Sequence, residues 1–158
     1  PSLDWDAERQ VASTTERAVV EREGLTVQGH GATAAPQMNA VRFQRDVQVD
    51  LQPATTITCD GPLVVDYARH RARFWRQVHV RDPRGDIWAD RMDVRMDPKT
   101  RRLTQVQCWG HVVIQRASQR ARAHRATYDA STEKIQLIGH PVITFYPDQV
   151  EPDGRPTP

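Results

Sequence analysis

The chain has 158 residues, 38% of them hydrophobic and 27% charged, a composition typical of one ordered globular domain rather than of a fibrous or disordered chain. The formal net charge is +2, and Lys99 and Lys134 are the only lysines, so arginine carries almost all of the basic charge. This modest balance gives little support to nucleic-acid binding, which usually needs a one-sided positive field. No apolar run approaches the length of about 18 residues that a membrane-spanning helix needs.

A short pattern recurs along the chain. Its copies are VASTTERAVV (11–20), VRFQRDVQV (41–49), ARFWRQVHV (72–80), VQCWGHVVIQ (106–115) and IQLIGHPVIT (135–144). The first copy is degraded and is visible only around Val11 and Val19. Anchor residues spaced by 31, 34 and 29 positions mark the other four copies, at Phe43, Phe74, Cys108 and Leu137. Self-similarity at such a spacing indicates a repeat architecture.

Within each copy, apolar residues alternate with polar ones, which is the period of a half-buried β-strand. A second alternating run lies between the copies. In DIWADRMDVRM (86–96), one bulge after Ala89 would put on a single face Ile87, Ala89, Met92, Val94 and Met96. In ARAHRATYD (121–129), the corresponding face holds Ala121, Ala123, Ala126 and Tyr128. The alternation predicts strands throughout and no helix.

Turn-forming sequences separate these runs at DPRGD (82–86), DPKT (97–100) and DAST (129–132). Each repeat is therefore expected to be two strands and a tight turn, and such a unit must stack on its neighbours to bury its apolar face. We predict an all-β fold in which stacked antiparallel β-hairpin repeats, about four to five of them, form a folded-over sheet. This single domain would span residues 1–146. The Pro-rich tail, residues 147–158, is expected to be disordered or to cap a sheet edge.

Several stretches resemble one family. GLTVQGHGATAAPQMNAVRFQRDVQV (24–49), IWADRMDVRMD with LTQVQCWGHVVI, and ARAHRATYD with EKIQLIGHPVI are similar to the repeat of the OstA-like periplasmic lipopolysaccharide-transport proteins. This family includes LptA, LptC and the amino-terminal domain of LptD. LDWDAERQVASTTERAVVEREG (3–24) resembles the lead-in of LptC-type chains. The resemblance covers roughly residues 3 to 144 and is carried by a degenerate repeat.

The resemblance implies a β-jelly roll, or β-taco, whose interior holds the acyl chains of lipopolysaccharide and whose copies join edge to edge. The chain departs from the family pattern in two ways. It lacks the amino-terminal membrane helix of LptC, which leaves an LptA-like and an LptC-like role open. Arg45 and Arg76 stand where other copies have Gly110 and Gly139.

The inward-facing residues are the expected ligand-binding site. They are Phe43, Val47, Val49, Phe74, Val78, Val80, Met92, Val94, Met96, Cys108, Val112, Ile114, Tyr128, Leu137 and Ile143. Sequence alternation alone does not distinguish an open groove from a packed core. Arg71 and Arg73, in ARHRARFWR (68–76), are expected to point outward, either as a solvated strand face or as a basic rim for lipid phosphates.

No pattern of catalytic residues is present, so we expect no enzyme, no cofactor and no metal. His111 and His140 occupy the same repeat position and are expected to point outward. Two surface histidines lack the further ligands that a metal site needs. Cys59 and Cys108 are expected to be buried thiols, and a disulfide between them is left open.

The expected function is therefore a periplasmic carrier or bridge module of lipopolysaccharide export, in contact with other OstA-like proteins or with itself. Two alternatives stay open, a stacked-β scaffold without lipid cargo and an arginine-rich nucleic-acid binder, although no nucleic-acid partner is expected. The sequence starts at Pro1 without a Met, and we expect that a leader or an inner-membrane anchor can precede it in the full-length protein.

Overall fold

The computed structural model describes residues 2–22, 24–35, 37, 39–100 and 102–146. Twelve strands form one antiparallel sheet, and the described residues contain no helix that is long and apolar enough to cross a membrane. The strands are β1 (Asp4–Asp6), β2 (Val11–Arg22), β3 (Leu25–Ala35), β4 (Ala40–Leu51), β5 (Thr55–Cys59), β6 (Leu63–Asp66), β7 (Arg71–Asp82), β8 (Gly85–Met96), β9 (Leu103–Arg116), β10 (Gln119–Asp129), β11 (Lys134–Ile138) and β12 (Val142–Phe145). The predicted all-β fold is confirmed.

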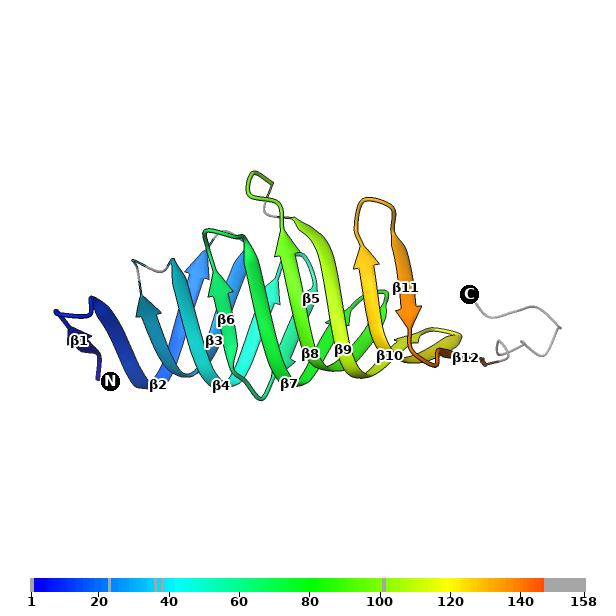
Figure 1. Cartoon of the computed structure of the whole chain (residues 1–158), viewed down its shortest axis with the longest axis horizontal. Helices are drawn as coiled ribbons and strands as arrows, with labels where there is room; N and C mark the ends of the chain where they lie inside the picture. Colours follow the sequence, from blue (N-terminus) through cyan, green and yellow to red (C-terminus); the bar gives the residue numbers. More distant parts are fainter. Residues whose placement is uncertain (1, 23, 36, 38, 101, 147–158) are drawn as a thin grey trace.

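The long strands bend in the middle, so that each contributes to two arms of the sheet. Strand β6 pairs with the first halves of β4 and β7, whereas β5 pairs with their second halves. Likewise, β11 pairs with residues 125–129 of β10, and β12 pairs with residues 119–122. The first arm therefore holds β1, β6 and β11, and the second arm holds β5 and β12. Strands β1 and β12 lie near opposite ends of the molecule (Figure 1).

The long strands bend along one line, which we call the corner, and several of them do so through residues with left-handed backbone conformation. The register of the ladder shifts there, for example between Trp75 and Val78 in β7 and between Trp88 and Arg91 in β8. Paired positive φ angles of 64° and 50°, 77° and 48°, and 82° and 48° occur at Arg76–Gln77, Gly110–His111 and Gly139–His140. The Gly-His pair that recurs in residues 106–115 and 135–144 is thus the corner of the fold, and the copy with Arg76 and Gln77 makes the same bend without glycine.

The apolar core fills the space between the arms next to the corner. Its fully buried large side chains come from both arms: Phe43, Val47, Ile57, Leu63, Phe74, Val78, Met92 and Val112. These residues lie within a few positions of a bend, so the packed part of the interior follows the corner. The predicted bulge after Ala89 is present, and the apolar faces predicted for residues 86–96 and 121–129 both contact the core.

Two residues near the ends of the sheet depart from the burial pattern of the other copies. Val19 pairs with Gln28 and is half exposed, while Ala18 and Val20 pack against the core, so the degraded first copy is offset by one residue. Ile143 pairs with Ala121, which contacts the core, yet Ile143 is 51% exposed. Strand β12 is the last strand of the second arm, and no further described strand covers it.

The repeats that the sequence suggests as separate short strands are in fact strands of up to 14 residues that cross the corner. The interrupted pairs β5–β6 and β11–β12 each take the place of one such strand, broken at Gly61 or at Gly139. The expectations for the tail 147–158 and for its boundary at residue 146 concern residues outside the described part of the chain.

The turns of the first arm lie along one edge, the first rim, at residues 7–10, 67–70, 98–100 and 130–133. Figure 1 shows the β8–β9 and β10–β11 turns at the same edge of the molecule. The aspartates that open these turns accept hydrogen bonds from backbone N–H groups two or three residues later, and they are Asp6, Asp66, Asp97 and Asp129. Asp side chains stabilise tight turns in this way because they replace a missing backbone partner.

We expect Gly139→Val to destabilise the protein by about 1 to 3 kcal/mol. A Cβ atom at position 139 would lie 2.9 Å from the Cβ atom of His124, and the φ of 82° disfavours any side chain. The free energy of unfolding, measured with urea, checks this. Gln136→Val, an exposed change on β11, the strand that ends just before Gly139, serves as the control and should alter that energy by less than about 0.5 kcal/mol. Equal effects would show that the glycine is incidental.

The aspartate turns predict a dependence of stability on pH. Backbone N–H groups of Thr100 and Lys99 lower the pKa of Asp97, and the hydroxyl and N–H of Ser131 lower that of Asp129. A lowered pKa in the folded state contributes stability above the unfolded value of about 3.9 and loses it as the pH falls through the folded pKa. The urea midpoint should therefore fall less between about pH 6 and pH 3 in D97N/D129N, whose amides cap without titrating. An unchanged acid profile in this double variant would contradict the expectation.

Candidate functional site

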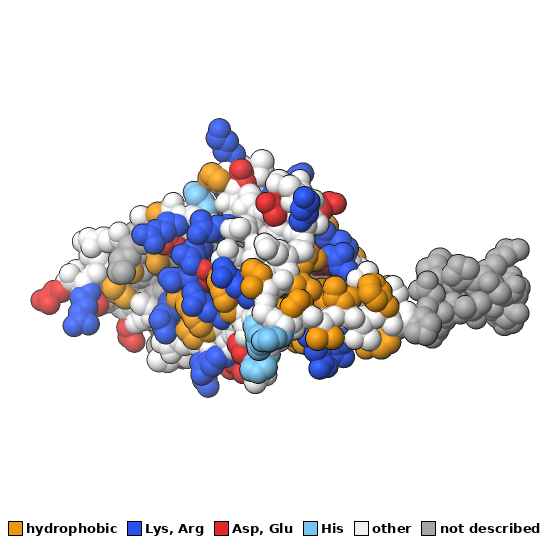
Figure 2. Space-filling model, turned by 45° about the vertical axis from the view of Figure 1, so that its right-hand side comes forward, with side chains coloured by type: hydrophobic (Ala, Val, Ile, Leu, Met, Phe, Trp, Pro, Cys, Tyr) orange, Lys and Arg blue, Asp and Glu red, His pale blue; other side chains and the backbone are white. Residues whose placement is uncertain are grey.

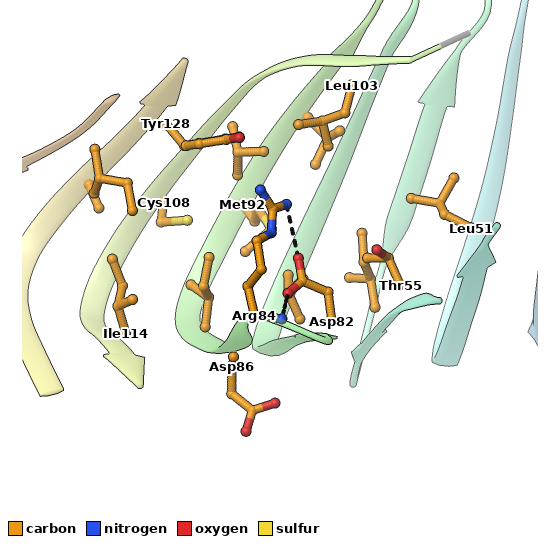
Figure 3. A pocket seen from close by; sticks show the side chains of 18 of the residues that line it. Leu51, Thr55, Asp82, Arg84, Asp86, Met92, Leu103, Cys108, Ile114 and Tyr128 are labelled. Carbon is orange, nitrogen blue, oxygen red and sulfur yellow. Dashed lines mark hydrogen bonds and ion pairs between the residues drawn. The ribbon is translucent and has the colours of Figure 1, made fainter. Parts of the chain in front are cut away.

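A groove of about 510 Å³ lies between the arms and reaches from one rim to the other. Residues of the first arm line one side, among them Met96, Leu103 and Tyr128, and residues of the second arm line the other, among them Leu51, Ile87 and Ile114 (Figure 3). The second rim comprises the turns at residues 52–54, 83–84 and 117–118. The volume is within the range of about 300 to 1,000 Å³ that is usual for sites that bind small molecules.

Burial falls from the corner to the rims along each strand. In β8, Met92 has no exposed surface, Val94 is buried, and Met96 is only half-buried. In β7, Phe74 and Val78 are buried and Val80 is half-buried. The interior is therefore a packed core at its base and an apolar groove at its mouth, because the two arms diverge as they leave the corner.

Seven of the residues expected from the sequence line the groove: Val80, Met92, Val94, Met96, Cys108, Ile114 and Tyr128. Five belong to the packed core, namely Phe43, Val47, Phe74, Val78 and Val112, and Val49 is buried beside them. Leu137 contacts the core from β11, and Ile143 lies at the exposed end described above. Sequence reasoning did not single out several lining residues, which include Leu51, Ile57, Leu103, Val106 and Ile135.

Charged side chains surround the mouth of the groove. Arg84 and Arg116 come from the second rim, and Arg102 comes from the β8–β9 turn on the first rim. The guanidinium of Arg84 lies 3.2 Å from a carboxylate oxygen of Asp82. The nearby Tyr128 hydroxyl first, and the Asp82 carboxylate second, raise the pKa of Arg84. Arg84 was missed because DPRGD has the composition of an ordinary turn.

Arg71 and Arg73 lie on the outer face of the first arm, opposite to the groove. Arg71 pairs with the carboxylate of Asp93, whose side chain is 5% exposed and which also lies 3.8 Å from Arg91. Arg73 is half-buried and lies opposite Asp93 in the ladder. The two arginines therefore point outward, as the alternation predicts, but they do not line the groove.

The same outer face carries a row of alternating aromatic and cationic side chains across β7 to β10. Trp75 pairs with Arg91, Arg91 with Trp109, and Trp109 with Arg125 in the strand register. The guanidinium carbons lie between 5.0 and 5.6 Å from the tryptophan ring centroids. Cation–π stacking of this kind stabilises a surface by about 0.5 to 1 kcal/mol per contact. These arginines are thus engaged within the sheet.

Cysteine and histidine show no reactive arrangement in the part of the chain that the structure describes. Cys59 and Cys108 are buried free thiols, and burial raises the pKa of Cys59 to about 11 and that of Cys108 to about 12. Both thiols therefore stay protonated at neutral pH. Exposed His111 contacts Asp90, and His140 packs edge-on against His124. The described residues contain no group of three or more His, Cys, Asp or Glu that could hold a metal ion.

Together, these features define a folded-over β-sheet protein with an apolar groove between its arms. Residues 56–154 match the family model described as LptA/(LptD N-terminal domain) LPS transport protein. Since this match spans more than half of the 158 residues, the chain belongs to that family of transport proteins. The family resemblance seen in the sequence is confirmed.

A solved structure shares the fold. It is the crystal structure of LptH from Pseudomonas aeruginosa, the LptA homologous periplasmic component of the conserved lipopolysaccharide transport device. The TM-score is 0.65 at 10% sequence identity, over 78% of this chain and 95% of that chain. An identity this low shows similarity of fold alone. No curated protein sequence matches the chain.

We expect Asp93→Asn to lower the free energy of unfolding by about 1 to 3 kcal/mol, because Arg71 would lose the partner of a half-buried charge. Urea denaturation measures this. Asp90→Asn is the matched control, since the side chains of Asp90 and His111 are both well exposed and such surface pairs contribute little to stability. If both variants unfolded at the same urea concentration, the buried ion pair would have no special role.

Proposed function

We propose that this chain is a periplasmic component of lipopolysaccharide transport that holds acyl chains in the groove between its two arms. The observation that carries the proposal is the apolar groove, which is lined by both arms and bordered by both rims. Membership of the transport-protein family and the fold shared with periplasmic LptH support the same assignment.

The physical argument rests on the burial gradient. Side chains such as Met96, Ile87 and Leu103 are only half-buried, so part of their apolar surface faces the groove rather than another side chain. An acyl chain in contact with them would leave water, and each buried methylene contributes roughly 0.8 kcal/mol. Several methylenes per chain would then supply enough free energy for binding without any covalent chemistry.

The two ends of the sheet suit contacts with related modules. Strands β11 and β12 end the first and second arms, and their outer edges have no further described strand beside them. Around them lie exposed apolar side chains, Ile138, Val142, Ile143, Phe145 and Tyr146. Figure 2 shows hydrophobic side chains gathered toward this end of the molecule. We propose edge-to-edge pairing there with another OstA-like module or with a second copy, because an unpaired strand edge accepts an added strand.

Photo-crosslinking tests the cargo. A photoreactive residue at Met96 or at Ile114, both of which line the groove, should label lipopolysaccharide on irradiation. The same residue at Arg95, which is exposed and points to the other face of β8, is the matched control and should not label. Labelling at Arg95 as strong as at Met96, or none at any site, would favour a scaffold without lipid cargo.

A further inference from the structure

The outer face of the first arm carries an excess of arginine. Six arginines of β4, β7, β8 and β10 alternate with inward-facing residues there and point away from the groove: Arg42, Arg71, Arg73, Arg91, Arg95 and Arg125. The acidic residue among them is Asp93, whose side chain is 5% exposed and pairs with Arg71. Asp66 and Asp129 lie farther out, at the first rim, where their carboxylates cap turns. The middle of this face is therefore strongly cationic.

Apolar side chains alternate with the cations in the row of this face nearest the corner. In the strand register from β7 to β11, the consecutive members of the row are Trp75, Arg91, Trp109, Arg125 and Ile138. Ile138 is 42% exposed, and both tryptophans are half-buried. Figure 2 likewise shows Lys and Arg side chains gathered beside hydrophobic ones. The face thus offers apolar surface together with positive charge.

The outer face of the second arm differs, although it is built from the same strands. Its outward arginines on β7 and β10 are Arg81, Arg120 and Arg122. Asp86 lies 3.6 Å from Arg81, and the carboxylate of Asp50 accepts a hydrogen bond from a threonine on the same face. The excess of positive charge is therefore confined to the first arm.

The surroundings of the two tryptophan rings restrict the kind of partner. Guanidinium carbons of Arg73 and Arg91 lie 5.4 and 5.6 Å from the ring centroid of Trp75. Those of Arg91 and Arg125 lie 5.0 and 5.4 Å from the centroid of Trp109. Single-stranded nucleic acids bind proteins by stacking their bases on aromatic rings, and these rings are already occupied. A lipid bilayer needs no free ring face, because indole groups lie among its headgroups while arginines contact its phosphates.

We propose that the outer face of the first arm binds the surface of an anionic phospholipid bilayer, with the sheet lying along the membrane. Its arginines contact the lipid phosphates, and the apolar side chains of the row lie between the headgroups. The groove is on the opposite face of this arm, so membrane binding and cargo binding use different surfaces. The inference goes beyond the proposed function and does not depend on it.

Vesicle co-sedimentation tests this surface. The probes are vesicles of phosphatidylcholine and phosphatidylglycerol in equal parts and vesicles of phosphatidylcholine alone, and neither contains lipopolysaccharide. Wild-type protein should bind only the anionic vesicles, and added salt should weaken the binding. The double variant Arg42→Gln/Arg95→Gln should lower partitioning into anionic vesicles about tenfold or more. Both side chains are exposed, and among the described residues neither forms an ion pair, so the fold should be unaffected.

The matched control is Arg81→Gln/Arg122→Gln. This double variant removes the same charge from two exposed positions of the second arm, so it should keep most of the wild-type partitioning. Urea denaturation of both double variants verifies that they are folded.

A polarity-sensitive fluorophore reports which face touches the membrane. Ile138→Cys and Val142→Cys place one exposed thiol each on the outer faces of the first and second arm, beside Arg125 and Arg122. The native thiols of Cys59 and Cys108 are buried, so the label attaches to the new position. Anionic vesicles should shift the emission of the label at position 138 to shorter wavelength and leave that at position 142 unchanged.

Several outcomes would overturn the membrane proposal. They are equal binding of both vesicle types by wild-type protein, equal partitioning of the two double variants, and equal emission shifts at positions 138 and 142. Release from anionic vesicles by a single-stranded oligonucleotide, beyond the effect of salt at the same ionic strength, would identify a nucleic-acid site instead. None of these results bears on the carrier function, because lipopolysaccharide is absent and the groove residues are unchanged.

Discussion

The bend of each long strand at the corner is the constraint on which the interior depends. A sheet of alternating residues buries one face only if something covers that face. Here the sheet covers itself, because the long strands bend back over their own apolar side, in β9 through the left-handed residues Gly110 and His111. The arms then diverge from the corner toward the rims. Because the arms diverge, the interior is packed at its base, next to the corner, and open at its mouth, between the rims.

The charged groups are distributed according to the same geometry. On the outer face of the first arm, arginine side chains contact tryptophan rings and the buried carboxylate of Asp93. These contacts stabilise the sheet on the face opposite to the groove. The rims are formed by turns, where the chain is free to present polar groups. Arg84 is the exception, since the side chain of this turn residue points over the groove lining, although it stays well exposed. The apolar groove and the cationic mouth therefore belong to different parts of each hairpin and can vary independently.

Much of the fold could be predicted from alternation alone. The inward faces of β8 and β10, including the bulge after Ala89, follow from a period of two with one interruption. The bends could not be predicted, because Arg76 and Gln77 adopt positive φ without the glycine that signals it elsewhere. The sequence also did not show which inward-pointing residues form the packed core and which line the groove. This depends on the distance of each residue from the corner, and not on the face of the sheet to which its side chain points. The partner of Arg71 is Asp93, 22 residues away, although the strand register places Arg95 directly opposite Arg71 and Asp93 opposite Arg73, so only the side-chain geometry identifies this pair.

The open lateral side of the fold has a consequence for how such a molecule can grow. A closed barrel fixes the number of its strands, because strand number and diameter are linked. A sheet that folds over along a straight corner has no such closure, so a hairpin can be inserted or lost without changing the cross-section. Neighbouring strands lie about 4.8 Å apart, so each hairpin adds roughly 10 Å to the length. The number of repeats therefore sets the length of such a chain, and duplication of a short gene segment would lengthen the groove while leaving its width the same.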